Sequence, residues 1–245
     1  MSLDVLELHD FYRTAAGEMA RRFIVARLRQ FWPGLPGKVV AGLGYPLPYL
    51  EDIGGDAARM MALMPARQGC LRWSAGGRNR ALLVDENRLP LPGQCIDRLL
   101  LAHALENAAD PPAALAECRR VLAENGRMLV IAAARRGFWA RGDATPFGAG
   151  RPYSLNQLSW LLRDNGFRLR RVRRALYAPP GDSRMLAHFS PLLEKLGSRW
   201  VPGWGGVIIA EAEKDRRAAA PLALRRSRPR ILALPRPAFA RTARP

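Results

Sequence analysis

The hydrophobic pattern of the chain changes repeatedly between a helical period and short, mainly apolar runs. Between Phe11 and Phe31, apolar residues recur every three or four positions, which predicts one amphipathic helix ending at Trp32-Pro33-Gly34. The short apolar runs are typical of strands buried in a parallel sheet. These predicted strands cover residues 38–43, 59–63, 81–84, 96–102 and 128–133.

Helix signals lie between these strands. Asp110-Pro111 sets a capping acid before a proline at the first helical position, and a capping box begins at Ser154. Another helix is expected over residues 185–196, between two final strands at 168–176 and 206–212. This alternation predicts an α/β fold with a doubly wound, mostly parallel seven-stranded sheet. The sheet is expected to be Rossmann-like and to end in an antiparallel strand pair.

The 245 residues are enough for one such domain, which we assign to residues 37–213, with residues 1–36 as a helical segment packed on it. Charge is concentrated in the remaining basic tail, residues 214–245. The whole chain carries +18, and the tail has ten Lys or Arg against one acid (10 − 1 = +9) and five prolines. We expect this tail to be disordered. It either binds nucleic acid or another anionic partner by counterion release, or is a solvated extension without a dedicated partner.

The sequence gives no sign of a membrane-spanning, secreted or metal-binding protein. No run reaches the roughly 18 apolar residues that a membrane-spanning helix needs. The acids Asp4 and Glu7 stand where a signal peptide would carry basic residues followed by an apolar stretch. The three cysteines lack the spacing of metal ligands. We therefore expect a cytoplasmic protein with no membrane span and no metal site.

A glycine-rich turn follows the first predicted strand. Gly42 and Gly44 permit a tight turn at the carboxyl end of that strand, the edge where open α/β sheets bind their ligands. The same pair also fits a plain strand-to-helix turn, so this turn alone does not define a binding site.

The stretch from about residue 37 to 135 resembles the type 11 group of class I methyltransferases. The matching elements are Asp85, Leu89-Pro90-Leu91, Asp97, His103 with Glu106, Arg120-Val121-Leu122 and Gly126-Arg127. The resemblance implies a methyltransferase that uses S-adenosylmethionine as its cofactor. In-line methyl transfer depends mainly on positioning, so no catalytic residue is identified from the sequence.

The resemblance also implies roles for individual residues. It places Gly42, Gly44 and the neighbouring Tyr45 against the methionine end of the cofactor. Asp85 would accept a hydrogen bond from the adenine amino group, with Glu86 beside it. His103 would line the pocket between cofactor and acceptor. Asp85 is alternatively a turn acid, and His103 a hydrogen-bonded residue at the end of a strand.

Three positions depart from the family pattern. Val40 and Pro46 replace the usual acid and the third glycine around the first turn, and the second strand ends in Met64-Pro65 without the acid that holds the ribose hydroxyls. Losing such a charged hydrogen bond weakens binding by roughly 1.5–3 kcal/mol. A dinucleotide-dependent reductase fits less well, because its motif requires glycine at Leu47.

A loop after the fifth strand combines basic and aromatic residues, a mixture that suits an anionic, planar or single-stranded nucleic-acid ligand. We predict a substrate loop formed by Arg135, Arg136, Phe138, Trp139 and Arg141. Alternatively, this loop is a lid that packs its aromatic side chains on the helices. Two functions remain open: a methyltransferase with an unknown acceptor, or a non-catalytic methyltransferase-like module that binds a partner through the basic tail and this loop.

Overall fold

The structure is a computed structural model that describes residues 3–75, 77–141, 145–181 and 184–216. The predicted tail beyond residue 216 therefore lies outside the described residues. The helices are α1 (Val5–Arg13), α2 (Ala15–Phe31), α3 (Leu47–Ile53), α4 (Pro111–Val121), α5 (Leu155–Asp164) and α6 (Arg184–Trp200), with short 3-10 turns η1 (Phe138–Ala140) and η2 (Pro202–Trp204). The strands are β1 (Val39–Gly44), β2 (Arg59–Pro65), β3 (Ser74–Ala75), β4 (Arg78–Asn79), β5 (Ala81–Val84), β6 (Ile96–Ala102), β7 (Leu122–Ala133), β8 (Phe167–Ala175) and β9 (Val207–Lys214).

Seven of the described strands form one sheet in the order β5-β2-β1-β6-β7-β9-β8. The first five are mutually parallel, while β9 pairs antiparallel with both β7 and β8. The predicted fold class is confirmed. Because β1 pairs parallel with both β2 and β6, the carboxyl ends of these three strands share one edge of the sheet.

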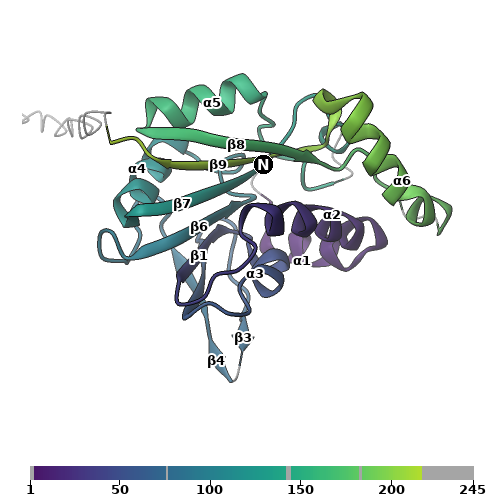
Figure 1. Cartoon of the computed structure of the whole chain (residues 1–245). Helices are drawn as coiled ribbons and strands as arrows, with labels where there is room; N and C mark the ends of the chain where they lie inside the picture. Colours follow the sequence, from purple (N-terminus) through teal and green to yellow (C-terminus); the bar gives the residue numbers. More distant parts are fainter. Residues whose placement is uncertain (1–2, 76, 142–144, 182–183, 217–245) are drawn as a thin grey trace, which may run out of the picture.

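Helices cover both faces of the sheet (Figure 1). One apolar cluster joins α1, α2 and α3 to alternate strand residues such as Val40 and Leu100. The other joins α4 and α5 to the opposite alternation, such as Ala41 and Leu99. This period of two explains the continuous apolar runs Leu99–Ala102 in β6 and Met128–Ala133 in β7, since each side chain of a covered parallel strand enters one of two cores.

The prediction of one helix from Phe11 to Phe31 is wrong, because the segment forms α1 and α2 with a break at Thr14. Thr14 has extended backbone angles, and its hydroxyl accepts a hydrogen bond from the Gly17 N–H at the start of α2. A Cβ atom at Gly17 would lie 2.0 Å from the Phe11 carbonyl oxygen. Thr14 therefore caps a second helix, and Gly17 allows the end of α1 to lie against it.

Other differences concern where elements begin and end. Strand β7 begins at Leu122, not at residue 128, because Leu122 is already extended and pairs with Ile96. The small β3–β4 hairpin was not predicted, since its strands are only two residues long. Among the described residues, no helix is long and apolar enough to cross a membrane, and no group of three or more His, Cys, Asp or Glu side chains could hold a metal ion.

Candidate functional site

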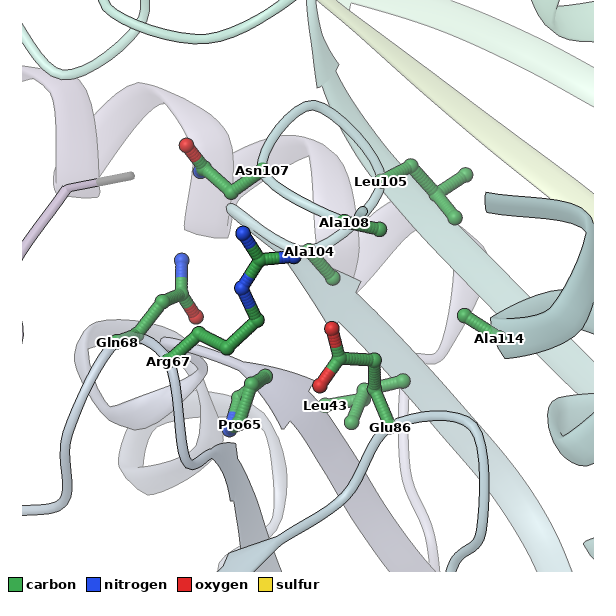
Figure 2. A pocket seen from close by; sticks show the side chains of 10 residues that line it. All are labelled: Leu43, Pro65, Arg67, Gln68, Glu86, Ala104, Leu105, Asn107, Ala108 and Ala114. Carbon is green, nitrogen blue, oxygen red and sulfur yellow. The ribbon is translucent and has the colours of Figure 1, made fainter. Parts of the chain in front are cut away.

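A narrow crevice opens at the carboxyl edge of the parallel strands (Figure 2). The free space inside it is about 10 Å³, about the room needed for one water molecule, so a larger ligand requires the lining side chains to move. Its walls come from β1, from the segments that follow β2, β5 and β6, and from α4. The lining residues are Leu43, Pro65, Arg67, Gln68, Glu86, Ala104, Leu105, Asn107, Ala108 and Ala114.

The glycine turn closes one side of this region and contributes Leu43 to the crevice wall. Gly44 has a φ of +94°, and a Cβ there would lie 2.1 Å from the Ala102 carbonyl oxygen on β6. That carbonyl accepts a 2.8 Å hydrogen bond from the Tyr45 N–H. At Gly42 a Cβ would meet the Pro46 ring at 2.3 Å. Both glycines are therefore required for the turn to pack against itself and β6.

The structure separates the two acids after β5. Asp85 is exposed, and its carboxylate accepts the Asn87 N–H at 2.9 Å, which is a turn-forming interaction. Glu86 is buried and points into the crevice (Figure 2). Of the two acids, Glu86 therefore lines the crevice and Asp85 does not, while the adenine role that the resemblance gives to Asp85 stays a prediction.

No acid follows β2, and the chain instead places Arg67 and Gln68 at the crevice. Arg67 is exposed, and Figure 2 shows its side chain lying across the pocket between Gln68 and Glu86. A nucleoside can enter only when the side chains at the mouth move aside. Gln68 is only 4% exposed, and its side-chain Nε2 donates a 2.9 Å hydrogen bond to the His103 carbonyl. Sequence reasoning missed Gln68, because glutamine in a loop is usually exposed.

His103 follows β6 with a φ of 50°, a conformation that is strained for a residue with a side chain. Its Nε2 is 2.7 Å from the Tyr12 hydroxyl, which is also hydrogen-bonded to Tyr49. Tyr45 stacks on the Tyr12 ring with centroids 5.9 Å apart. Helix α1 is therefore tied to the glycine turn, to α3 and to the end of β6 through one buried phenol.

Glu106 lies on the other side of His103, with Oε1 3.8 Å from the imidazole Nδ1. Both side chains are almost completely buried. Burial disfavours charge, so it raises the pKa of Glu106 to about 7 and lowers the pKa of His103 to about 3. Near neutral pH the imidazole is uncharged, and the carboxyl group is close to its own titration midpoint.

The predicted substrate loop does not gather its residues at the crevice. Arg135 and Arg136 are exposed, whereas Trp139 is buried and donates from Nε1 to the Ala178 carbonyl at 2.7 Å. Phe138 is partly exposed, and the Arg141 guanidinium stacks over it at 4.9 Å. Residues 142–144 of this loop lie outside the described residues. The role of the loop in substrate binding stays a prediction.

Phe147 shows how the loop packs toward the site. Its ring lies 5.0 Å from His103, 5.7 Å from Trp139 and 6.1 Å from Phe11. The loop therefore packs its buried aromatic side chains against α1 and the residue after β6, as the alternative interpretation of a lid expected.

Four buried side-chain atoms near the end of β6 have no hydrogen-bond partner in the described structure. They are Gln68 Oε1, His103 Nδ1, Glu106 Oε2 and Asn107 Oδ1. An unsatisfied buried polar atom typically costs about 1–3 kcal/mol, so polar atoms gathered at a crevice indicate a place for a polar ligand or water. Of these four residues, Gln68 and Asn107 line the crevice, so polar groups stand beside its apolar walls.

Comparison of the sequence with known proteins finds similarity to methyltransferases. Residues 38–130 match the family model of the methyltransferase domain. A ubiquinone/menaquinone biosynthesis C-methyltransferase from Bordetella avium is 38% identical over 97 residues, covering 39% of this chain and 35% of that protein. A protein from Mycobacterium tuberculosis is 30% identical over 138 residues, covering 54% of this chain and 45% of the relative. The chain thus spans less than half the length of these curated relatives.

Solved structures agree in fold. An S-adenosylmethionine-dependent methyltransferase from Thermotoga maritima superposes with a TM-score of 0.58 at 17% identity, covering 86% of this chain and 95% of its own. The [4+2]-cyclase SpnF has a TM-score of 0.57 at 19% identity, covering 82% and 83%. Because such identities establish the fold alone, the reaction has to be argued from the site.

Proposed function

We propose that the chain is a class I S-adenosylmethionine-dependent methyltransferase that binds this cofactor in the crevice and transfers its methyl group to an acceptor. The match of residues 38–130 to the methyltransferase-domain model and the identity to a C-methyltransferase support this proposal. The observation that carries the proposal is the crevice itself. It lies at the carboxyl ends of β1, β2, β5 and β6, and buried acceptor atoms without partners stand beside it. This is the edge where open parallel sheets hold their ligands.

Different residues of the crevice would contact different parts of the cofactor. When bound, S-adenosylmethionine supplies a methyl group on a positively charged sulfur. Leu43 and Leu105 offer apolar walls to the adenine ring, and the buried Glu86 offers a carboxylate to its amino group. The positive Arg67 at the mouth disfavours the cationic sulfur and ammonium groups there, so these groups belong toward the glycine turn and His103.

The acceptor side of the proposed site is formed by His103 and Tyr12. Both side chains are buried, and α1 covers them through the Tyr12 hydrogen bonds. An acceptor therefore reaches the transferred methyl group only after α1 moves away from the end of β6. The matched relative from Bordetella avium is named as a C-methyltransferase of ubiquinone/menaquinone biosynthesis.

The two acids after β5 provide a matched pair for testing cofactor binding. We expect Glu86→Gln to weaken the binding of S-adenosylhomocysteine about tenfold, because a charged acceptor of the adenine amino group is lost. Asp85→Asn should leave the affinity within about twofold, because its side chain faces the turn. Isothermal titration calorimetry of both variants measures the difference.

Thermal unfolding of both variants without ligand provides the control. Equal affinities for wild type and Glu86→Gln would remove Glu86 from the adenine site. A larger loss in Asp85→Asn than in Glu86→Gln would restore the role that the family resemblance gives to Asp85.

A second candidate function, binding of an anionic partner, is favoured by a groove near the amino ends of β6 and β7. One carboxylate, Glu211, lines this groove together with four arginines, which are Arg98, Arg127, Arg170 and Arg171. Residues 217–245, which follow closely on β9, carry eight arginines and no acid.

Deletion of residues 217–245 should abolish retention of single-stranded RNA in a filter-binding assay at low salt. Unchanged retention would exclude the tail as the binding segment.

A further inference from the structure

Two side-chain amides share one backbone acceptor at the crevice. The His103 carbonyl accepts a hydrogen bond from Gln68 Nε2 at 2.9 Å and one from Asn107 Nδ2 at 3.1 Å. Turning either amide around would set its oxygen against the carbonyl oxygen, so this carbonyl fixes both orientations. Each amide oxygen is therefore left without a partner, and both are buried.

The two free oxygens differ in direction. Figure 2 shows the Gln68 oxygen turned toward the other side chains that line the crevice, whereas the Asn107 oxygen points away from them. Gln68 is held rigidly, because its N–H donates to the Pro65 carbonyl at 2.9 Å and its own carbonyl accepts the Val5 N–H at 2.7 Å. The free oxygen of Gln68 is thus a fixed acceptor at the end of β2.

We infer that Gln68 Oε1 accepts a hydrogen bond from a ribose hydroxyl of the bound cofactor and takes the place of the carboxylate that this chain lacks after β2. A neutral amide oxygen suits a neutral hydroxyl donor. The charged donors of the cofactor are disfavoured here by Arg67, the next residue in the chain. The other acceptor of the crevice, Glu86, follows β5 and is left for the adenine amino group. This inference rests on the proposed function.

A double-mutant cycle between protein and ligand tests the inference. Calorimetry would compare S-adenosylhomocysteine with its 2′,3′-dideoxy analogue on wild type and on Gln68→Met, which keeps the length of the side chain but lacks the acceptor. For wild type we expect removal of the hydroxyls to weaken binding about tenfold, the effect of one or two hydrogen bonds. For Gln68→Met we expect the two ligands to differ by less than about twofold.

Asn107→Leu is the matched control, because it also removes one donor from the His103 carbonyl. It should retain the tenfold difference between the two ligands. Gln68→Glu preserves an acceptor and should retain the difference as well, which covers the case in which Gln68→Met does not fold.

The possible results distinguish a failure of the role given to Gln68 from a failure of the proposed function. If wild type and Gln68→Met lose the same affinity on removal of the hydroxyls, the role of Gln68 is overturned while the proposed function stands. If loss of the difference is found in Asn107→Leu and not in Gln68→Met, the assignment is also overturned. If wild type gives no heat with S-adenosylhomocysteine, the proposed function and this inference fall together.

Discussion

Replacing Gly44 with alanine should destabilise the protein by about 3 kcal/mol or more and eliminate cofactor binding. Two costs add at this position. The φ of +94° is unfavourable for any residue with a Cβ, and that Cβ would lie 2.1 Å from the Ala102 carbonyl oxygen. To relieve the clash, β1 must move away from β6, which widens the crevice edge. Urea unfolding gives the stability, and calorimetry with S-adenosylhomocysteine gives the affinity.

Gly37→Ala is the control for this prediction. Gly37 also has a positive φ, of +69°, but its Cβ would meet no atom within 4 Å. The Gly37→Ala substitution should therefore lower the free energy of unfolding only by the backbone penalty of about 1 kcal/mol. Equal losses for the two variants would show that the contact between the glycine turn and β6 contributes nothing to stability.

Replacing Glu106 with glutamine should make the protein more stable at pH 8, by up to about 3 kcal/mol, and leave its stability near pH 4.5 almost unchanged. The pKa of Glu106 is raised from 4.5 to about 7 by burial. The folded state thus holds this proton more tightly than the unfolded state. Its contribution is fully present below pH 4.5 and is lost as the pH rises through about 7, so wild type should lose stability over this interval. Unfolding monitored by circular dichroism at several pH values measures the effect.

Other titratable groups near Glu106 also make stability depend on pH. His103 acts in the opposite sense, because its lowered pKa gives stability that is present above 6.5 and lost as the pH falls toward 3. The other titratable groups that face Glu106 are Tyr12, Tyr49 and Tyr153, whose pKa values burial raises. Glu124→Gln, at an exposed site, should reproduce the wild-type profile. A profile of Glu106→Gln parallel to wild type would contradict a buried, raised carboxyl.

The sheet could be predicted because its signals are local. The strands around Leu100 and Leu129 are apolar on both faces, and α4 and α5 begin at recognisable caps, so each element is defined within a few residues of sequence. The break between α1 and α2 was missed, since it depends on Thr14 as a cap inside an uninterrupted apolar pattern.

The site was only partly predictable, because its contacts join distant parts of the chain. The region after β6 was expected to lie at the carboxyl edge of the sheet, and Ala104 and Leu105 line the crevice there. The hydrogen bond from Tyr12 to His103, however, spans 91 residues. The amide of Gln68 is defined by a carbonyl 35 residues away. The inward turn of Glu86, with Asp85 facing out, depends on the turn geometry after β5, which one sequence does not specify.

The fold also leaves the reaction undetermined. The same architecture is shared by a Thermotoga methyltransferase and by SpnF, which is named as a [4+2]-cyclase. Chemistry on this scaffold is therefore decided by the residues of the crevice and its acceptor side. In this chain we propose that those residues include Gln68, Glu86 and the buried group of Tyr12, His103 and Glu106.

A crystal structure of the protein grown with S-adenosylhomocysteine tests the central claim most directly. We predict electron density for the ligand in the crevice, with adenine between Leu43 and Leu105, its amino group at Glu86 and a ribose hydroxyl at Gln68 Oε1. Crystals grown at millimolar ligand that show an empty crevice, or the ligand bound elsewhere, would contradict the proposal that this edge of the sheet is a cofactor site.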